Sequence, residues 1–434
     1  MKLNVKRTVL VGLAFLSICS FWQYYDNIIP LVLKETFALG ETWTGVIMAF
    51  DNILALFLLP LFGALSDKVE LPVGRRMPFI LCGTGLSVVL LLILNVADRS
   101  RNFVMFIVVL LLLLVAMGTY RSPAVALMPD VTPAPLRSKG NAVINLMGTL
   151  GAVYTLVMIK LLVKTPEDGA LTNYLPLILS IVLLMIVAVA ILFATIKENK
   201  LREEVQGLTG GSGAEEEEAD EAQQKNAGAK LPPEVKRSLV FLLLSIFFWF
   251  TAYNAVTTAW SRYATVVWEL KDGGYANCLL VATLAAVAAY IPIGLISSKI
   301  GRKKTILGGV AMMTVCYFVA ALLPNYYSWL YGLFAVIGIG WAAINVNSYP
   351  MVVEMAKAGD IGKYTGTYYT FSMAAQVFTP IFSGFLLEHV SYRTLFPYAV
   401  IFSLIAFVTM LQVRHGDSRP DAKKSALEHF DVDD

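Results

Sequence analysis

Twelve apolar stretches, each about 20 residues long or longer, follow one another along the chain and restrict what it can fold into. A stretch of this length crosses the hydrocarbon core of a bilayer, where the backbone can satisfy its polar groups only within helices or a closed barrel. The predicted spans are residues 8–31, 42–66, 77–97, 103–129, 140–163, 171–196, 238–264, 275–298, 304–323, 327–352, 364–388 and 394–413. The sequence therefore predicts an all-α membrane protein with twelve transmembrane helices.

The composition agrees with residence in a lipid bilayer. Only 15% of the 434 residues are charged, whereas a soluble domain has about a quarter, and the mean hydropathy is +0.67. The first apolar stretch is too long for a secretory signal, and no small-residue cleavage site follows it, so we expect it to remain as a span. Four cysteines fall within predicted spans, which favours small buried hydrophobes over disulfides or metal ligands. The three histidines show no metal-binding spacing, so we expect no metal or other cofactor.

Lysine and arginine are unevenly distributed over the loops. If the N-terminus lies inside, cytoplasmic segments hold about 25 of the 34 lysines and arginines. Positive residues normally accumulate on the cytoplasmic side, so this orientation is favoured. External loops hold only Lys34, Arg99, Arg101, Lys164, Lys271 and Arg393. This asymmetry predicts a multi-pass protein of the cell membrane with both termini in the cytoplasm.

A polar segment at residues 197–237 divides the chain. It is rich in Gly, Ser, Glu, Gln and Lys, so it cannot bury a core and should be disordered or loosely helical. The acidic run at 215–218 is either a solvated part of this linker or a docking site. We therefore predict an N-terminal six-helix bundle and a C-terminal one, connected by the linker and followed by a cytoplasmic tail. The predicted boundaries are 1–196, 197–237, 238–413 and 414–434.

The two halves repeat each other. The charged hairpin "GALSDKVELPVGRRMPFI" (63–80) joins the second and third spans, and the shorter "GLISSKIGRKKTIL" (294–307) joins the eighth and ninth. Asp130 at the end of the fourth span and Glu354 at the end of the tenth also correspond. Parallel six-helix repeats are typical of transporters whose halves rock around a site at the bilayer midplane. We expect salt bridges at the hairpins to lock one conformation and to release it in the other.

The hairpin carries a family resemblance. "GALSDKVELPVGRRMPF" resembles the hairpin of the major facilitator superfamily, and its longer form with "GRRMPF" (74–79) resembles the variant of plant sucrose transporters and their animal relatives. That group lies near the glycoside–pentoside–hexuronide:cation symporters. "ALMPD" (126–130), followed by "GNA" (140–142), is similar to the same group. The resemblance implies two pseudo-symmetric six-helix bundles, a sugar substrate and a cytoplasmic gate. We expect the gate at Gly63, Asp67, Arg75, Arg76, Asp130, Arg137 and Glu354.

Charged residues inside the predicted spans need a partner or a function, since each costs at least about 2.5 kcal/mol to insert. Burial disfavours a charged carboxylate, so Asp26 in "SFWQYYDNIIP" is the candidate to bind and release a proton. The alternative is a hydrated carboxylate at the outer headgroups. Arg121 occupies the place where proton-coupled members of the superfamily often carry an arginine, and Asp26 is its natural partner. It could instead bridge helix ends or Asp130. Plant sucrose transporters have an acid deeper in the fourth span, where residues 111–118 are apolar here.

Asp51 and Asn52 lie in the outer half of the second span. They are either a second coupling group or part of an outer gate. With Asp26 and Asn27 they could form the oxygen cage that Na⁺ prefers. The predicted coupling ion is H⁺, bound by Asp26, and this possible cage makes Na⁺ the alternative.

Polar and aromatic residues on the remaining spans suit a sugar. Amides and hydroxyls match its hydroxyl groups, and aromatic faces pack against its C–H surfaces. Ordinary helix packing and an interfacial aromatic belt are the alternative. The predicted substrate-binding residues are Gln23, Asn27, Asn145, Asn254, Trp260, Arg262, Trp341, Asn345 and Gln376.

These features predict a secondary transporter that imports a glycoside or a disaccharide such as sucrose or maltose with H⁺. A Na⁺-coupled symporter is one alternative. An antiporter exporting a small molecule is another, although the fifth span, "GNAVINLMGTLGAVYTL" (140–156), lacks the proline usual in such exporters. No catalytic constellation or GxxxxGK[ST] motif supports an enzyme. We expect a monomer in the bilayer that binds no nucleic acid.

Overall fold

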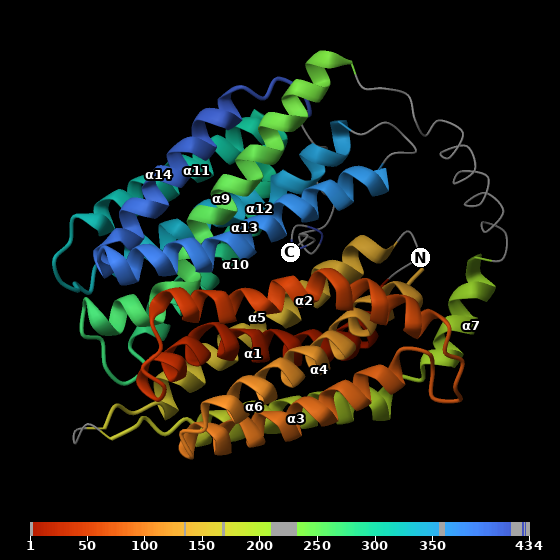
Figure 1. Cartoon of the computed structure of the whole chain (residues 1–434). Coiled ribbons are helices and arrows are strands. Elements are labelled where there is room, and N and C mark those ends of the chain that lie inside the picture. Colours follow the sequence, from red (N-terminus) through yellow and green to blue (C-terminus); the bar gives the residue numbers. More distant parts are fainter. Residues whose placement is uncertain are drawn as a thin grey trace. The chain divides into compact units, whose positions relative to one another are not determined.

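A computed structural model of the protein describes residues 3–133, 136–166, 170–209, 232–355, 361–417, 428 and 430. Helices dominate the described residues, and twelve of them are long and apolar enough to cross a membrane (Figure 1). The prediction of an all-α membrane protein with twelve transmembrane helices is thereby confirmed.

The helices of the first half are α1 (Val5–Glu35), α2 (Glu41–Asp67), α3 (Met77–Arg99), α4 (Phe103–Asp130), α5 (Arg137–Leu162) and α6 (Leu175–Thr195), followed by the shorter α7 (Glu198–Thr209). Those of the second half are α9 (Pro233–Val266), α10 (Tyr275–Ile300), α11 (Arg302–Ala321), α12 (Leu330–Met355), α13 (Ile361–His389), the short 3₁₀ helix η2 (Tyr392–Thr394) and α14 (Leu395–Leu411). Residues 1–208 with 264–280 form one compact unit, and residues 209–263 with 281–434 form the other.

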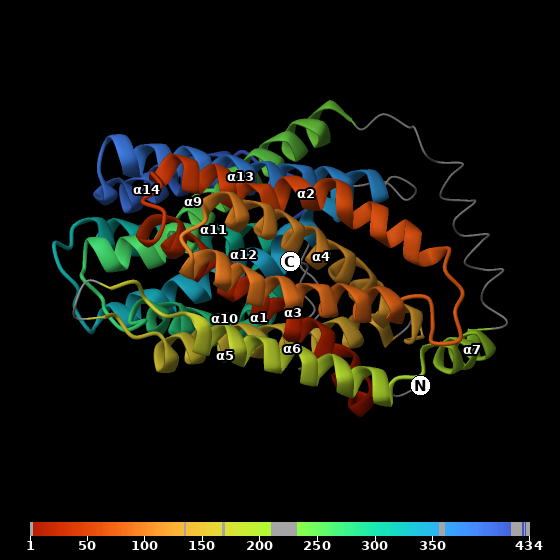
Figure 2. The same cartoon turned by 60° about the horizontal axis from the view of Figure 1, so that its bottom comes forward.

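The linker begins with a regular helix. α7 comes directly after α6 in the chain (Figure 2) and occupies 198–209 of the segment predicted as disordered or loosely helical. The linker's last described residues, from Pro233, already belong to α9. The acidic run at 215–218 and most of the tail lie outside the described residues.

The helix ends follow local chemistry more closely than hydropathy. α1 starts at Val5 because the Asn4 side chain caps it, accepting a hydrogen bond from the Arg7 N–H at 3.1 Å. α6 starts four residues later than predicted, with a proline in its first turn. Tyr174, just before α6, places its hydroxyl 3.2 Å from Glu35 Oε2 at the end of α1. Burial, together with the Glu35 charge, raises the pKa of Tyr174.

Close packing of α1 on α5 explains why the fifth span contains glycines. A Cβ at Gly151 would lie 2.0 Å from the carbonyl oxygen of Leu16, so no larger residue fits there. One turn further along, the Ser20 and Thr155 hydroxyls are 2.7 Å apart in the buried contact. Small residues and interhelical hydroxyl bonds hold membrane helices together where hydrophobic burial adds little.

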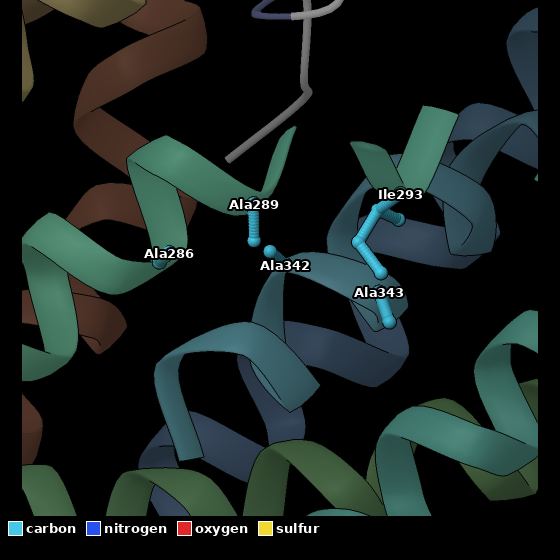
Figure 3. Packing of buried hydrophobic residues seen from close by; sticks show 5 residues of the cluster. All are labelled: Ala286, Ala289, Ile293, Ala342 and Ala343. Carbon is cyan, nitrogen blue, oxygen red and sulfur yellow. The ribbon is translucent and has the colours of Figure 1, made fainter. Parts of the chain in front are cut away.

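The second half uses the same device between α10 and α12. Figure 3 shows the buried side chains of Ala286, Ala289 and Ile293 on α10 against Ala342 and Ala343 on α12. These small side chains let two helix backbones approach closely. Each half therefore contains a tightly packed helix pair built on small residues.

Candidate functional site

Two arginines of the loop between α2 and α3 meet two carboxylates at the ends of α2 and α4. Arg75 Nε lies 3.0 Å and Arg76 Nε 2.9 Å from the same oxygen of Asp130. Arg76 Nη2 also donates to Asp67, and Arg75 Nη1 lies 3.9 Å from the same Asp67 oxygen. These four residues, the hairpin cluster, form one network in the first half. The structure thus brings together four of the residues predicted for the cytoplasmic gate.

Arg76 is the deepest member of the hairpin cluster. Its side chain is 5% exposed, and its Nη1 donates to Ser66 Oγ and lies 3.3 Å from the carbonyl oxygen of Gly63. A buried cation is tolerated only when paired and hydrogen-bonded, and this set of acceptors meets that requirement. Burial lowers the pKa of Arg75, but the hydrogen bond and charge of Asp130 outweigh it and raise the pKa above its ordinary value. The cluster therefore holds two permanent cations.

Glu198, the first residue of α7, completes this region and was not identified from the sequence. Its buried carboxylate accepts hydrogen bonds from the backbone N–H groups of Arg75 at 2.9 Å, Arg76 at 2.9 and 3.1 Å, and Met77 at 3.0 Å. These groups lie at the start of α3, where unpaired N–H groups and the helix dipole favour an anion. Gly74, with φ of +121°, brings the loop so close that a Cβ would lie 2.1 Å from the Glu198 side chain.

The corresponding hairpin of the second half is simpler. Arg302 Nη1 donates to Glu354, which was predicted for the gate and lies near the end of α12. The Lys303 N–H donates to Asp417 Oδ1 at 2.8 Å, just after α14. Arg137, also predicted for the gate, is exposed at the start of α5, and no ion pair joins it to a carboxylate within the described ranges.

Asp26, Asp51 and Arg121, the residues predicted for ion coupling, all lie within spans of the first half. Asp26 lies on α1, Asp51 on α2 and Arg121 on α4. The predicted ion pair between Arg121 and Asp26 is not formed among the described residues. The Arg121 guanidinium instead lies 5.8 Å from the ring centre of Trp22, a cation–π distance. Asp26, Asp51 and Arg121 therefore lie on three helices of the same half without the predicted pairing of Arg121 with Asp26.

Polar atoms gather on α1 around Asp26. The Asn27 amide nitrogen donates to the Gln23 carbonyl oxygen at 2.9 Å, while its buried Oδ1 has no hydrogen-bond partner in the described part of the chain. The same holds there for Trp22 Nε1 and the Tyr25 hydroxyl. Buried polar groups are normally satisfied, so unpaired ones mark a place where a ligand or water belongs. Asn145, on α5, is half-buried.

An aromatic pair and an amide lie together on α9 and α12 in the second half. The rings of Tyr253 and Trp341 stack with centroids 3.7 Å apart and an interplanar angle of 1°, and both remain partly exposed. Asn254 follows on α9, with a buried Nδ2 that has no partner among the residues described. Gln376 on α13 is partly exposed. We call Tyr253, Asn254 and Trp341 the aromatic–amide face.

The other predicted binding residues of this half are buried. Trp260 is fully enclosed, 4.5 Å from Phe334 between ring centroids, and lies in an aromatic core. Arg262 is 3% and Asn345 is 4% exposed. Their positions in the sequence predicted that they lie close to Asn254 and Trp341 on the same helices. In the structure, neighbouring side chains cover them.

No group of His, Cys, Asp and Glu in the described residues has the arrangement to hold a metal ion. All four cysteines are unpaired thiols; Cys278 and Cys316 are buried as predicted, whereas Cys82 is exposed on α3, against the prediction.

Comparison with known proteins gives two kinds of match. The family model of the Major Facilitator Superfamily matches residues 11–275 and 274–431. A sucrose transport protein of Arabidopsis thaliana is 30% identical over 138 residues, covering 27% of this chain and 23% of the relative. An uncharacterized MFS-type transporter of Mycobacterium tuberculosis is 27% identical over 175 residues, covering 39% of this chain and 25% of the relative. The matches span about a quarter of the length of these relatives.

Solved structures share the fold over nearly the whole chain. The crystal structure of a nucleoside transporter, NupG, superposes with a TM-score of 0.67 at 15% identity, covering 95% of this chain and 100% of that chain. At this identity the match establishes the fold alone.

Proposed function

The chain belongs to the Major Facilitator Superfamily, and from this premise we propose that it carries a sugar, a glycoside or a disaccharide, across the cell membrane together with a proton. It is a multi-pass membrane transporter rather than an enzyme. We propose import by alternating access, with both termini in the cytoplasm as the lysine and arginine distribution favours.

The charged residues Asp26, Asp51 and Arg121 in the spans of the first half carry the proposal of proton coupling. A charged carboxylate inside a membrane is costly, so a carboxylate there is a natural group to bind and release a proton. We assign the coupling proton to Asp26, which lies on α1 among the unpaired polar atoms of Trp22, Tyr25 and Asn27. Loss of this proton leaves a negative charge that the surroundings must accommodate by moving.

The aromatic–amide face supports a sugar as the substrate. The stacked Tyr253 and Trp341 rings present an apolar surface for sugar C–H groups, and the unpaired Asn254 amide nitrogen is a donor for a hydroxyl oxygen. Gln23 and Asn27 on α1, together with Gln376 on α13, are further candidates. The local identity to a sucrose transport protein agrees with this choice.

Uptake into proteoliposomes tests the proposal directly. Purified protein would be supplied with a panel of radiolabelled glycosides and disaccharides. Either a pH gradient, with the outside more acidic, or a Na⁺ gradient, with more Na⁺ outside, would be imposed. Proton-coupled import predicts accumulation under the pH gradient alone. Accumulation under Na⁺ alone would assign the oxygens of Asp26, Asn27, Asp51 and Asn52 to a Na⁺ site. Pumping that lowers the internal substrate level would indicate an exporter.

A further inference from the structure

A basic cavity of about 460 Å³ lies where the start of α1 meets the end of α6 and the start of α7. Figure 2 shows this corner of the first half, with α7 turning away from α6. Four cations line the cavity, Lys6, Arg7, Lys197 and Lys200, and Glu204 is the one carboxylate among the lining residues. The cavity therefore carries a surplus of about three positive charges.

The pairing within the cavity leaves its lysines available. Glu204 Oε2 lies 3.3 Å from Arg7 Nη1, so it compensates the least exposed of the four cations. Lys6, Lys197 and Lys200 are exposed, and no carboxylate pairs with them in the part of the chain that the structure describes. α1 begins at this point, so the partial positive charge of its N-terminus adds to theirs.

An apolar strip on α6 leads to the cavity. The exposed side chains of Leu179, Leu183, Ile186 and Phe193 recur at helical spacing, and Leu183 is 62% exposed. From Leu179 to Phe193 the strip extends about 21 Å along the helix at roughly 1.5 Å per residue, more than half of the ~30 Å hydrocarbon core. It ends beside Lys197, whose ammonium lies 5.8 Å from the Phe193 ring centre.

The geometry points to a binding site for the phosphate headgroup of an anionic phospholipid. An acyl chain that lies on the α6 strip places its headgroup at the membrane surface where Lys6, Lys197 and Lys200 converge. Lysine ammonium groups bind phosphate as point charges, and basic pockets between membrane helices on the cytoplasmic side suit anionic lipids. The assignment to the cytoplasmic leaflet follows from the orientation proposed above. A phospholipid is favoured over a free phosphate ion because its acyl chain can cover the apolar strip, whereas a phosphate ion has no apolar part.

A lipid-binding measurement tests the site without any transport assay, so its failure is distinct from a failure of the proposed function. Full-length protein in detergent would be titrated with phosphatidylglycerol and, separately, with phosphatidylcholine, and bound lipid counted by native mass spectrometry. We expect a tightly bound phosphatidylglycerol in the unmodified protein. Replacing all three lysines by glutamine (K6Q, K197Q and K200Q together) should weaken its binding about a hundredfold, because each lysine near an anionic surface contributes about fivefold.

A matched variant removes the same charge elsewhere. Lys236, Lys299 and Lys304 are exposed at helix ends of the second half, and their joint replacement by glutamine should leave the tightly bound phosphatidylglycerol in place. Replacing the three cavity lysines by arginine should retain binding and show that the corner still folds. Equal loss in both glutamine variants would reduce the effect to net charge and overturn the proposal.

The source of the phosphate is tested in the same titration. Millimolar inorganic phosphate or glycerol 3-phosphate should not displace the bound phosphatidylglycerol, because neither offers a chain to the α6 strip. Displacement by either ion at a concentration comparable with that of the lipid would assign the cavity to a soluble phosphate compound and overturn the lipid assignment.

Discussion

The two halves place a carboxylate after their sixth helix and use it at the start of their third helix, but to different depths. In the first half Glu198 is buried and accepts from three consecutive backbone N–H groups at the start of α3. In the second half Asp417 is exposed and accepts from the N–H of Lys303 near the start of α11. A glycine with positive φ precedes each helix, Gly74 at +121° and Gly301 at +94°. The repeat thus conserves the local geometry while the burial of the cap differs.

The two halves also differ in their charged side chains. The first half combines the hairpin cluster with Asp26, Asp51 and Arg121 inside its spans. The second half has the Arg302–Glu354 pair at its hairpin, and its spans contain the buried Arg262 as well as the neutral aromatic–amide face. On the proposed function, we assign ion coupling to the first half and sugar recognition mainly to the second. The transport predictions below test this division, and the stability predictions test the two caps.

Asp26→Asn should have the largest effect. The amide cannot carry a proton, so accumulation driven by a pH gradient should fall to the level of simple equilibration, while counterflow exchange of labelled sugar stays within about twofold. Uptake and counterflow in the same proteoliposomes measure both. Glu203→Gln, an exposed change on α7, is the control for expression and folding. Normal accumulation in Asp26→Asn with loss in Asp51→Asn would move the coupling proton to Asp51.

Glu198→Ala should be the most destabilising change at either cap. It removes a buried carboxylate and leaves three N–H groups of the α3 start without an acceptor, a loss of about 2–3 kcal/mol. The apparent melting temperature in detergent, followed by tryptophan fluorescence, checks this. Glu198→Gln keeps one carbonyl oxygen and should lose about half as much. If Glu203→Ala lowered the melting temperature equally, α7 would matter only as a helix.

Trp341→Ala should raise the KM for sugar uptake about tenfold with little change in maximal rate. The substitution removes one ring of the aromatic–amide face, and aromatic contacts contribute about 0.5–1.5 kcal/mol beyond burial. Trp329, which is 51% exposed, provides the matched control as Trp329→Ala. A loss of coupling rather than affinity in Trp341→Ala would contradict the division of roles between the halves.

Asp67→Ala should lower turnover about fivefold and leave the KM nearly unchanged. Asp67 is 54% exposed, so its pairs with Arg75 and Arg76 are worth about 1 kcal/mol or less. Both arginines keep Asp130 as a partner in the variant. Initial rates of uptake over a range of sugar concentrations separate the two parameters. A large rise in KM at normal turnover would show that the hairpin cluster does not act as a gate.

The sequence allowed the spans to be predicted because apolar length, a pattern local in the chain, determines a span wherever water is excluded. The hairpin cluster was predicted although Asp130 lies 54 and 55 residues from its arginines, because its residues stand in motifs that resemble those of a known family. Glu198 was missed because its partners lie 121 to 123 residues away and its own surroundings have the composition of a linker. A positive-φ glycine just before a helix start is the signal that could have suggested an approaching cap.

Side-chain direction between helices was the harder problem. Asp26 and Arg121 were predicted to pair, yet the Arg121 guanidinium lies 5.8 Å from the centre of the Trp22 ring instead. Trp260 and Asn345 share helical spacing with exposed residues but are buried, because helix rotation and neighbouring helices decide which side of a polar helix is covered. Periodicity gives the faces of a helix without saying what each face meets.

Asp417→Ala should have the smallest effect, and for that reason it is the sharpest test of the comparison between caps. The carboxylate is exposed and accepts from one described N–H group, so water replaces it and the loss of stability should be about 0.5 kcal/mol or less. Lys303 retains its side-chain bonds to the carbonyl oxygens of Leu411 and Val413, at 3.0 and 2.6 Å, which hold the end of α14 to α11 without Asp417. The melting temperature measured beside that of Glu198→Ala decides the matter, since a drop as large as that of Glu198→Ala would mean that the two caps are equivalent and that burial does not set their strength.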